Sequence, residues 1–314
     1  MADFDSVCAA ICLLTNAAAD EGMPQPVSRS AMRRLLSSGT LRGLVLCDAA
    51  KVDPLLVDRA RVLLSRAKRV YECLERYFAC GYEVILPSDR IWPERLFALG
   101  DRMPQFLFIR GNRELLSADK VSVAGSRDIL PDVQRAAVSL GAMLAREGFC
   151  LVSGGARGVD TAAEQGALQA DGCALIVPAL PENRFFAEEY RRGTVESGQM
   201  LVMYDTLPDE PFSAQKAIAR NHTIYALGEA AIAVAARDGV GGTWHGAMDC
   251  LATRCTPVYI PQSELLGGNG AKGLLARGAA RIDLSQPLRP QLYQTKQMNL
   301  FSAEDREGTG CRQN

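Results

Sequence analysis

The spacing of apolar residues predicts helices in the first part of the chain. Over residues 1–80, apolar positions recur at intervals of three and four, which is typical of amphipathic helices. One pattern begins at Ser28 or Ser30 and is expected to end at Gly39, because serine favours helix starts and glycine favours helix ends. A longer pattern over residues 53–81 continues for about six turns and also ends at a glycine. We therefore predict a small helical domain over residues 1–80.

Short apolar runs alternate with helical patterns in the middle of the chain. Eight runs fall at residues 82–87, 106–111, 120–126, 149–155, 173–179, 200–205, 230–236 and 257–262. Continuous runs of this kind suit parallel strands that are covered on both faces. Their alternation with helices predicts an α/β fold, an extended Rossmann-like doubly wound parallel sheet, over residues 82–284.

The last region, residues 285–314, loses this periodicity and is predicted to be a flexible tail. Within it, Gln297-Met298-Asn299-Leu300-Phe301 resembles the short peptide with which bacterial proteins dock on the DNA polymerase sliding clamp. Leu300 and Phe301 would enter an apolar pocket while Gln297 makes polar contacts. Alternatively, Leu300 and Phe301 pack back onto the domain.

Composition narrows the classes of function. The 35 Lys and Arg residues nearly balance 36 Asp and Glu, which argues against a uniformly basic nucleic-acid coat but leaves room for a local basic groove. Two histidines and ten cysteines without a CxxC pair argue against a metal site, and we expect no cofactor. No apolar run is long enough to span a bilayer and the first residues do not resemble a secretion signal, so we expect a cytoplasmic protein without a membrane partner.

Three glycine-containing loops follow predicted strands at the edge where open parallel sheets bind ligands. Glycine lets a ligand approach the backbone, hydroxyl groups and arginines bind phosphate, and the amides at a helix start attract anions. The turns end in Ser126-Arg127, in Ser153-Gly154-Gly155 ahead of a helix near Gly158, and in Gly242-Thr243. The candidate phosphate-binding residues of these loops are Gly125, Ser126, Arg127, Ser153, Gly154, Gly155, Arg157, Gly242 and Thr243.

Aromatic residues near these loops allow two interpretations. Phe185, Phe186 and Trp244 could stack on bases, or they could pack in the core. Core packing is the more common role of phenylalanine.

The loops resemble segments of the DprA/Smf family of DNA-processing proteins. The resemblance covers about residues 92–282 and includes, in the family's order, KVSVAGSR, LVSGGARGVDTAAEQGAL, ARNHTIYALG, GVGGT and GNGAKGLLARGAA. It implies a non-enzymatic, homodimeric protein that binds single-stranded DNA and delivers it to a RecA-type recombinase. The residues that it would place at the DNA are Arg127 and the loops Ser153–Arg157 and Asn183–Arg184. Arg220 and Asn221 are further candidates for phosphate binding.

The chain departs from the family pattern at several positions. His222 stands where the family usually has a second arginine, Glu164 replaces a histidine, and no winged helix follows. A divergent role, for example in phage defence, is therefore also expected. The alternative resemblance is to nucleotide-sensing or nucleotide-cleaving proteins of the LOG and SLOG groups, in which Asp160 and Glu164, one helical turn apart, would be catalytic.

Overall fold

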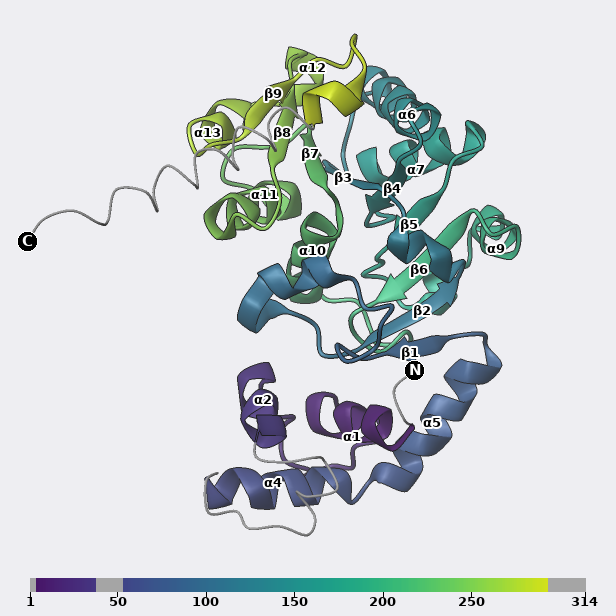
Figure 1. Cartoon of the computed structure of the whole chain (residues 1–314), viewed down its shortest axis with the longest axis vertical. Helices are drawn as coiled ribbons and strands as arrows, with labels where there is room; N and C mark the ends of the chain where they lie inside the picture. Colours follow the sequence, from purple (N-terminus) through teal and green to yellow (C-terminus); the bar gives the residue numbers. More distant parts are fainter. Residues whose placement is uncertain (1–3, 38–52, 293–314) are drawn as a thin grey trace, which may run out of the picture. The chain divides into compact units, whose positions relative to one another are not determined.

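The computed structural model describes residues 4–37 and 53–292, which form two compact units (Figure 1). Unit 1 comprises residues 1–117 and 177–213, and unit 2 comprises residues 118–176 and 214–314. This division differs from the predicted boundary near residue 81, because unit 1 combines the predicted helical region with three strands. No helix of the described residues is long and apolar enough to cross a membrane.

The described part of unit 1 begins with the helices α1 (Phe4–Leu14), α2 (Arg29–Ser37), α4 (Pro54–Leu64) and α5 (Ala67–Ala79). The predicted serine start is present, since the Ala31 amide donates to Ser28 Oγ over 3.1 Å at the beginning of α2. The predicted helix end at Gly39 lies outside the described residues. The pattern over residues 53–81 forms α4 and α5, and the expectation of one continuous helix is wrong.

The side chain of Arg66 lies buried at the break between α4 and α5. Arg66 is only 1% exposed, and its guanidinium donates to the carbonyl oxygens of Leu63 (3.2 Å), Ala17 (2.8 Å), Cys12 and Thr15. Several of these carbonyls lie at or just beyond the end of α1, where a cation complements the helix dipole. Burial lowers the pKa of the guanidinium. The charged group therefore joins α1 to the start of α5.

The strands of unit 1 are antiparallel. β2 (Leu107–Gly111) pairs with both β1 (Glu83–Ile85) and β6 (Met200–Tyr204), and Phe108 lies opposite Val84 and Tyr204. The prediction of parallel strands is wrong here, because an apolar run reports burial and carries no information about direction. The short elements of this unit are η1 (Glu94–Arg102), η2 (Arg113–Ser117), α8 (Glu182–Phe185) and α9 (Glu189–Glu196).

Unit 2 contains the predicted parallel sheet, with strand order β5-β4-β3-β7-β8-β9. The strands are β3 (Lys120–Gly125), β4 (Cys150–Ser153), β5 (Ala174–Ile176), β7 (Ala230–Val234), β8 (Val258–Pro261) and β9 (Ala280–Ile282). The sequence pattern did not reveal β9, a three-residue strand that is only partly buried. The order reverses between β3 and β7, and ligands of doubly wound sheets bind at such a reversal.

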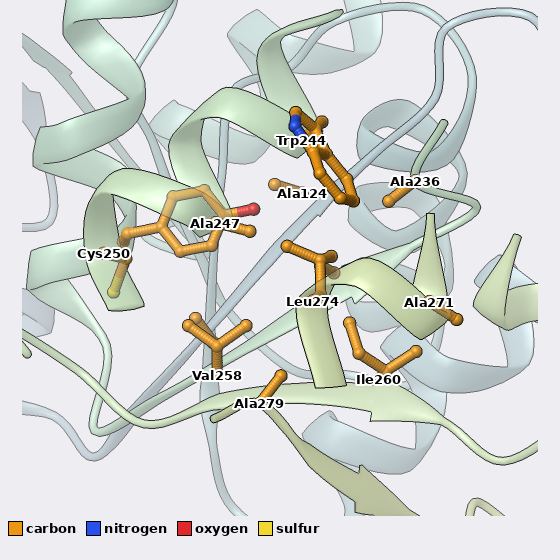
Figure 2. Close-up of a cluster of buried hydrophobic side chains, with 13 residues drawn as sticks. Ala124, Ala236, Trp244, Ala247, Cys250, Val258, Ile260, Ala271, Leu274 and Ala279 are labelled. Carbon is orange, nitrogen blue, oxygen red and sulfur yellow. The ribbon is translucent and has the colours of Figure 1, made fainter. Parts of the chain in front are cut away.

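Helices cover both faces of this sheet. On one face, α6 (Pro131–Arg146) lies against α7 (Val159–Gln169), and backbone contact at Gly141 and Gly166 allows their close approach. On the other face, α10 (Ala214–Leu227), α11 (Gly241–Thr253) and α13 (Ala271–Leu275) pack on an apolar cluster (Figure 2). Unit 2 also contains α12 (Glu264–Gly267) and a helical segment over residues 288–292, which lies within the region predicted to be a flexible tail.

Candidate functional site

The predicted loops of unit 2 follow β3, β4 and β7, which are parallel neighbours, so the loops share one edge of the sheet. The first two are joined through the start of α7. The Val159 amide donates to the Ser126 carbonyl over 3.1 Å, and Gly158 has a positive φ of 92°. A β-carbon at Gly158 would collide with the Ser126 carbonyl, so this approach requires glycine.

The amides at the start of α7 are largely used within the protein. Val159 donates to Ser126, and Thr161 donates to the Ala156 carbonyl over 3.0 Å. The carboxyl group of Asp160 occupies the same turn and accepts from the Gly125 amide over 3.2 Å. The start of α7 is therefore a weaker anion-binding site than the sequence predicted, because the Asp160 carboxylate already lies there.

Asp160 and Arg220 form a buried charged pair beneath the loop that follows β4. Asp160 is 6% exposed and Arg220, on α10, is 4% exposed. Burial raises the pKa of Asp160 to about 6, although Arg220 and the amides of Gly125 and Ala156 favour its ionised form. A β-carbon at Gly154 would overlap the Arg220 guanidinium. Arg220, predicted to grip phosphate, is thus enclosed beneath the loop and positions it.

The predicted serines also have structural roles. Ser153 Oγ donates to the Val123 carbonyl over 2.8 Å, and Ser126 Oγ donates to the Asp128 carbonyl over 3.1 Å. Both side chains are buried. Their hydroxyl groups therefore shape the loops that follow β3 and β4.

Exposed arginines provide the positive charge of this edge. Arg127 and Arg157 are both exposed, and Arg157 forms a 2.5 Å ion pair with Asp128. Arg237, which sequence reasoning missed, is exposed on the loop after β7. Its position directly after a predicted strand was the signal that could have identified it. These three arginines, on neighbouring loops, are the basic edge of unit 2.

The start of α11 is open at the same edge. A β-carbon at Gly239 or Gly241 would meet no heavy atom within 4 Å. Asn221 Nδ2 donates to the Gly242 carbonyl over 2.9 Å, and the Tyr225 hydroxyl donates to the Thr243 carbonyl over 3.1 Å. Asn221, which is buried, therefore positions the first turn of α11.

His222, at the position of the expected arginine, joins two helices. Its Nε2 lies 2.8 Å from Asp249 Oδ2, which connects α10 to α11. His222 therefore takes part in a contact between two helices of unit 2, at a position where the resemblance led us to expect an arginine.

The other predicted residues are divided between solvent and core. Asn183 and Arg184 are exposed on α8, which belongs to unit 1. Phe185 and Phe186 are buried in unit 1. Trp244 lies in the core of unit 2 (Figure 2), so the base-stacking interpretation of these aromatic residues is wrong.

The proposed catalytic pair is enclosed as well. Glu164 is 0% exposed, and Asp160 forms the contacts given above. Within residues 4–37 and 53–292, no three His, Cys, Asp or Glu side chains gather so that they could hold a metal ion.

Unit 1 contains a pocket that the sequence did not indicate. It has a volume of about 320 Å³ and lies between the end of α1, the start of α2 and the loop after β6. Thr15, Arg29, Asp205 and Glu210 contribute polar groups to its wall, and Phe106 contributes apolar surface. Its residues are scattered in the sequence and share no motif.

Comparison with known proteins gives consistent matches. The sequence model of the DNA recombination-mediator protein A family matches residues 83–289. The structure of DNA processing protein A from Streptococcus pneumoniae is 22% identical, with a TM-score of 0.66, and the match covers 90% of this chain and 95% of that one.

A second solved structure is that of DNA processing protein A from Helicobacter pylori, which was described for its single-stranded DNA binding mode. It is 22% identical, with a TM-score of 0.55, and the match covers 69% of this chain and 96% of that one. Both similarities show the α/β fold. No curated protein matches the sequence.

Proposed function

Since the chain belongs to the DNA recombination-mediator protein A family, a family of DNA processing, we propose that it binds single-stranded DNA at the basic edge of unit 2. The observation that carries this proposal is the presence of three exposed arginines, Arg127, Arg157 and Arg237, on loops that follow adjacent parallel strands. The first turn of α11 is open as well, and the positive end of its helix dipole lies where a phosphate could bind.

The buried residues explain how the loops keep their shape. Asp160 and Arg220 form the support beneath Gly154, while Asn221 positions the start of α11. Contacts to phosphate bind without strong sequence preference. We therefore propose binding through the DNA backbone. Asn183 and Arg184, which are exposed on α8 of unit 1, are separate candidates for contact with DNA.

Binding of a labelled oligothymidine, measured by fluorescence anisotropy at about 50 and about 200 mM salt, tests this proposal. Arg127→Ala is expected to weaken binding and to reduce the slope of log K against log salt by about 0.7 for each lost phosphate contact. The matched control is Arg146→Ala, an exposed arginine in the last turn of α6, at the opposite edge of the sheet. Absence of binding by the wild-type protein at low salt, or equal effects of both substitutions, would exclude this DNA-binding edge.

The finer role that we propose is protection of single-stranded DNA and its delivery to a RecA-type recombinase by a homodimer, with phage defence as a further setting. Recombinase loading predicts that DNA bound by this protein activates the recombinase ATPase sooner than DNA covered by a single-strand-binding protein. Light scattering should give twice the mass of one chain. An unchanged lag would argue against delivery, and a monomer would argue against the homodimer.

The tail carries a separate proposal, docking on the DNA polymerase sliding clamp through Gln297, Leu300 and Phe301. These residues lie outside the described part of the chain. Replacement of Leu300 and Phe301 by alanine is expected to abolish capture of the purified clamp, whereas Arg146→Ala should leave it unchanged. Equal capture by wild type and the double variant would reject this docking peptide.

Binding of a free nucleotide is the second candidate, favoured by the open glycine turn at Gly241. It predicts thermal stabilisation by NAD or purine nucleotides. Hydrolysis would in addition release the base, although the burial of Asp160 and Glu164 weighs against it. If neither stabilisation nor release is observed, the nucleotide candidate fails.

A further inference from the structure

Two cysteine thiols lie in direct contact at the end of α11. Cys250 is in the last turn of the helix, and Cys255 follows two residues after the helix ends at Thr253. The intervening Arg254 has a left-handed backbone conformation with φ of 53°, which turns the chain back over the helix end. The two sulfur atoms are 3.1 Å apart.

The two thiols differ in their accessibility. Cys250 is 2% exposed and belongs to the apolar cluster between α11 and the sheet, where it lies at one side of the group (Figure 2). Its thiol donates to the Thr256 carbonyl over 3.2 Å. Cys255 is partly exposed, packs against the cluster and donates to Cys250 Sγ. A reagent can therefore reach Cys255, while Cys250 is already in place to react with it.

We propose that Cys250 and Cys255 form a modification site, at which a low-molecular-weight disulfide such as oxidised glutathione converts them reversibly into an intramolecular disulfide. This inference is independent of DNA binding. The contact between the sulfurs and the difference in their exposure carry it, since thiol–disulfide exchange requires one accessible thiol and a second one nearby.

The reaction balances in two exchange steps. Cys255 loses its proton, and its thiolate attacks one sulfur of the small disulfide, which forms a mixed disulfide and releases one small thiolate. Cys250 then loses its proton, and its thiolate attacks Cys255 Sγ and displaces the second small thiolate. The two released protons convert the leaving thiolates into thiols. The cysteine pair is oxidised by two electrons, and the small disulfide is reduced by two.

Trypsin provides a direct test, because Arg254 separates the two cysteines. The full-length protein is incubated with oxidised glutathione, the remaining thiols are alkylated, and the digest is analysed by mass spectrometry without reduction. We expect a cross-linked pair of peptides, residues 238–254 joined to residues 255–272, which disappears after treatment with dithiothreitol.

Substitutions distinguish the two thiols. Cys250→Ser should accumulate a glutathione adduct on Cys255, because the second step is blocked, whereas Cys255→Ser should give neither the cross-link nor an adduct on Cys250. Cys80→Ser, which removes an exposed thiol after α5, is the matched control and should leave the cross-link unchanged. Wild-type protein that acquires glutathione on Cys80 but shows no cross-linked peptide would overturn the proposal.

Discussion

Gly154 lies directly against the guanidinium group of Arg220, at the point where the loop after β4 passes over α10. A β-carbon at Gly154 would overlap Arg220 and would lie 2.8 Å from Asp160 Oδ2. Because the arginine comes from a helix outside the loop, the loop and the helix can adopt this arrangement only with a small residue at position 154. The sequence showed a glycine-rich turn, but the reason for this glycine is a contact within the protein.

We therefore expect Gly154→Ala to lower the free energy of unfolding by about 1–3 kcal/mol, because neither backbone nor buried charges can move without loss of contacts. Gly193→Ala is the control, since that glycine lies in α9 and a β-carbon there meets no atom within 4 Å. The control should be neutral or stabilising by up to about 1 kcal/mol. Urea denaturation measures both, and an unchanged midpoint for Gly154→Ala would contradict the close contact.

Asp160 should make stability depend on pH. Its pKa is about 6 in the folded protein and close to 3.8 in the unfolded chain, so the folded state binds more protons between these values. Its contribution to stability is complete below about pH 4 and is lost as the pH rises through about 6, in total roughly 3 kcal/mol.

Asp160→Asn removes this titration while retaining the side-chain shape. The difference in unfolding free energy, wild type minus variant, is expected to fall by roughly 3 kcal/mol between about pH 4 and about pH 7. Urea denaturation at a series of pH values measures it. Parallel pH profiles of the two proteins would show that burial does not shift Asp160.

The buried Arg66 should contribute strongly to the stability of the N-terminal helical region. Arg66→Ala leaves several carbonyl oxygens of unit 1 without their donor, and we expect a loss of about 3 kcal/mol or more in unfolding free energy. Arg61→Ala, on exposed α4 surface beside Asp58, should change stability by less than about 0.5 kcal/mol. Equal thermal unfolding of the two variants would disagree with the role assigned to Arg66.

Asp128 should reduce the affinity for DNA, because its carboxylate pairs with Arg157. On the proposed function, Asp128→Ala is expected to tighten oligothymidine binding several-fold and to steepen its salt dependence, since Arg157 then meets phosphate without a competing anion. Asp132→Ala makes the same charge change next to Arg135 on α6. Anisotropy titrations in which Asp132→Ala binds as tightly as Asp128→Ala would indicate a general charge effect.

Local patterns predicted the elements well and their partners less well. The eight apolar runs all contain strands, and the helix expected near Gly158 begins at Val159. The antiparallel direction of β1, β2 and β6 was missed, because direction depends on which strands pair and not on the residues within one strand. The two-helix break at Arg66 was missed because a charged residue fits the exposed side of a helical pattern.

The sequence by itself determined the order of the first eight strands, the glycine turns at the strand ends and the family. The spacing and type of residues are sufficient to predict these features, because each is a pattern of residues that lie close together in the sequence. Only the tertiary structure decided that Arg220 is enclosed while Arg127, Arg157 and Arg237 are exposed. The environment of a side chain is set by residues far away in the sequence: Arg220 lies beside Asp160 because α10 and α7 both pack on the sheet of unit 2, and no local pattern records that meeting.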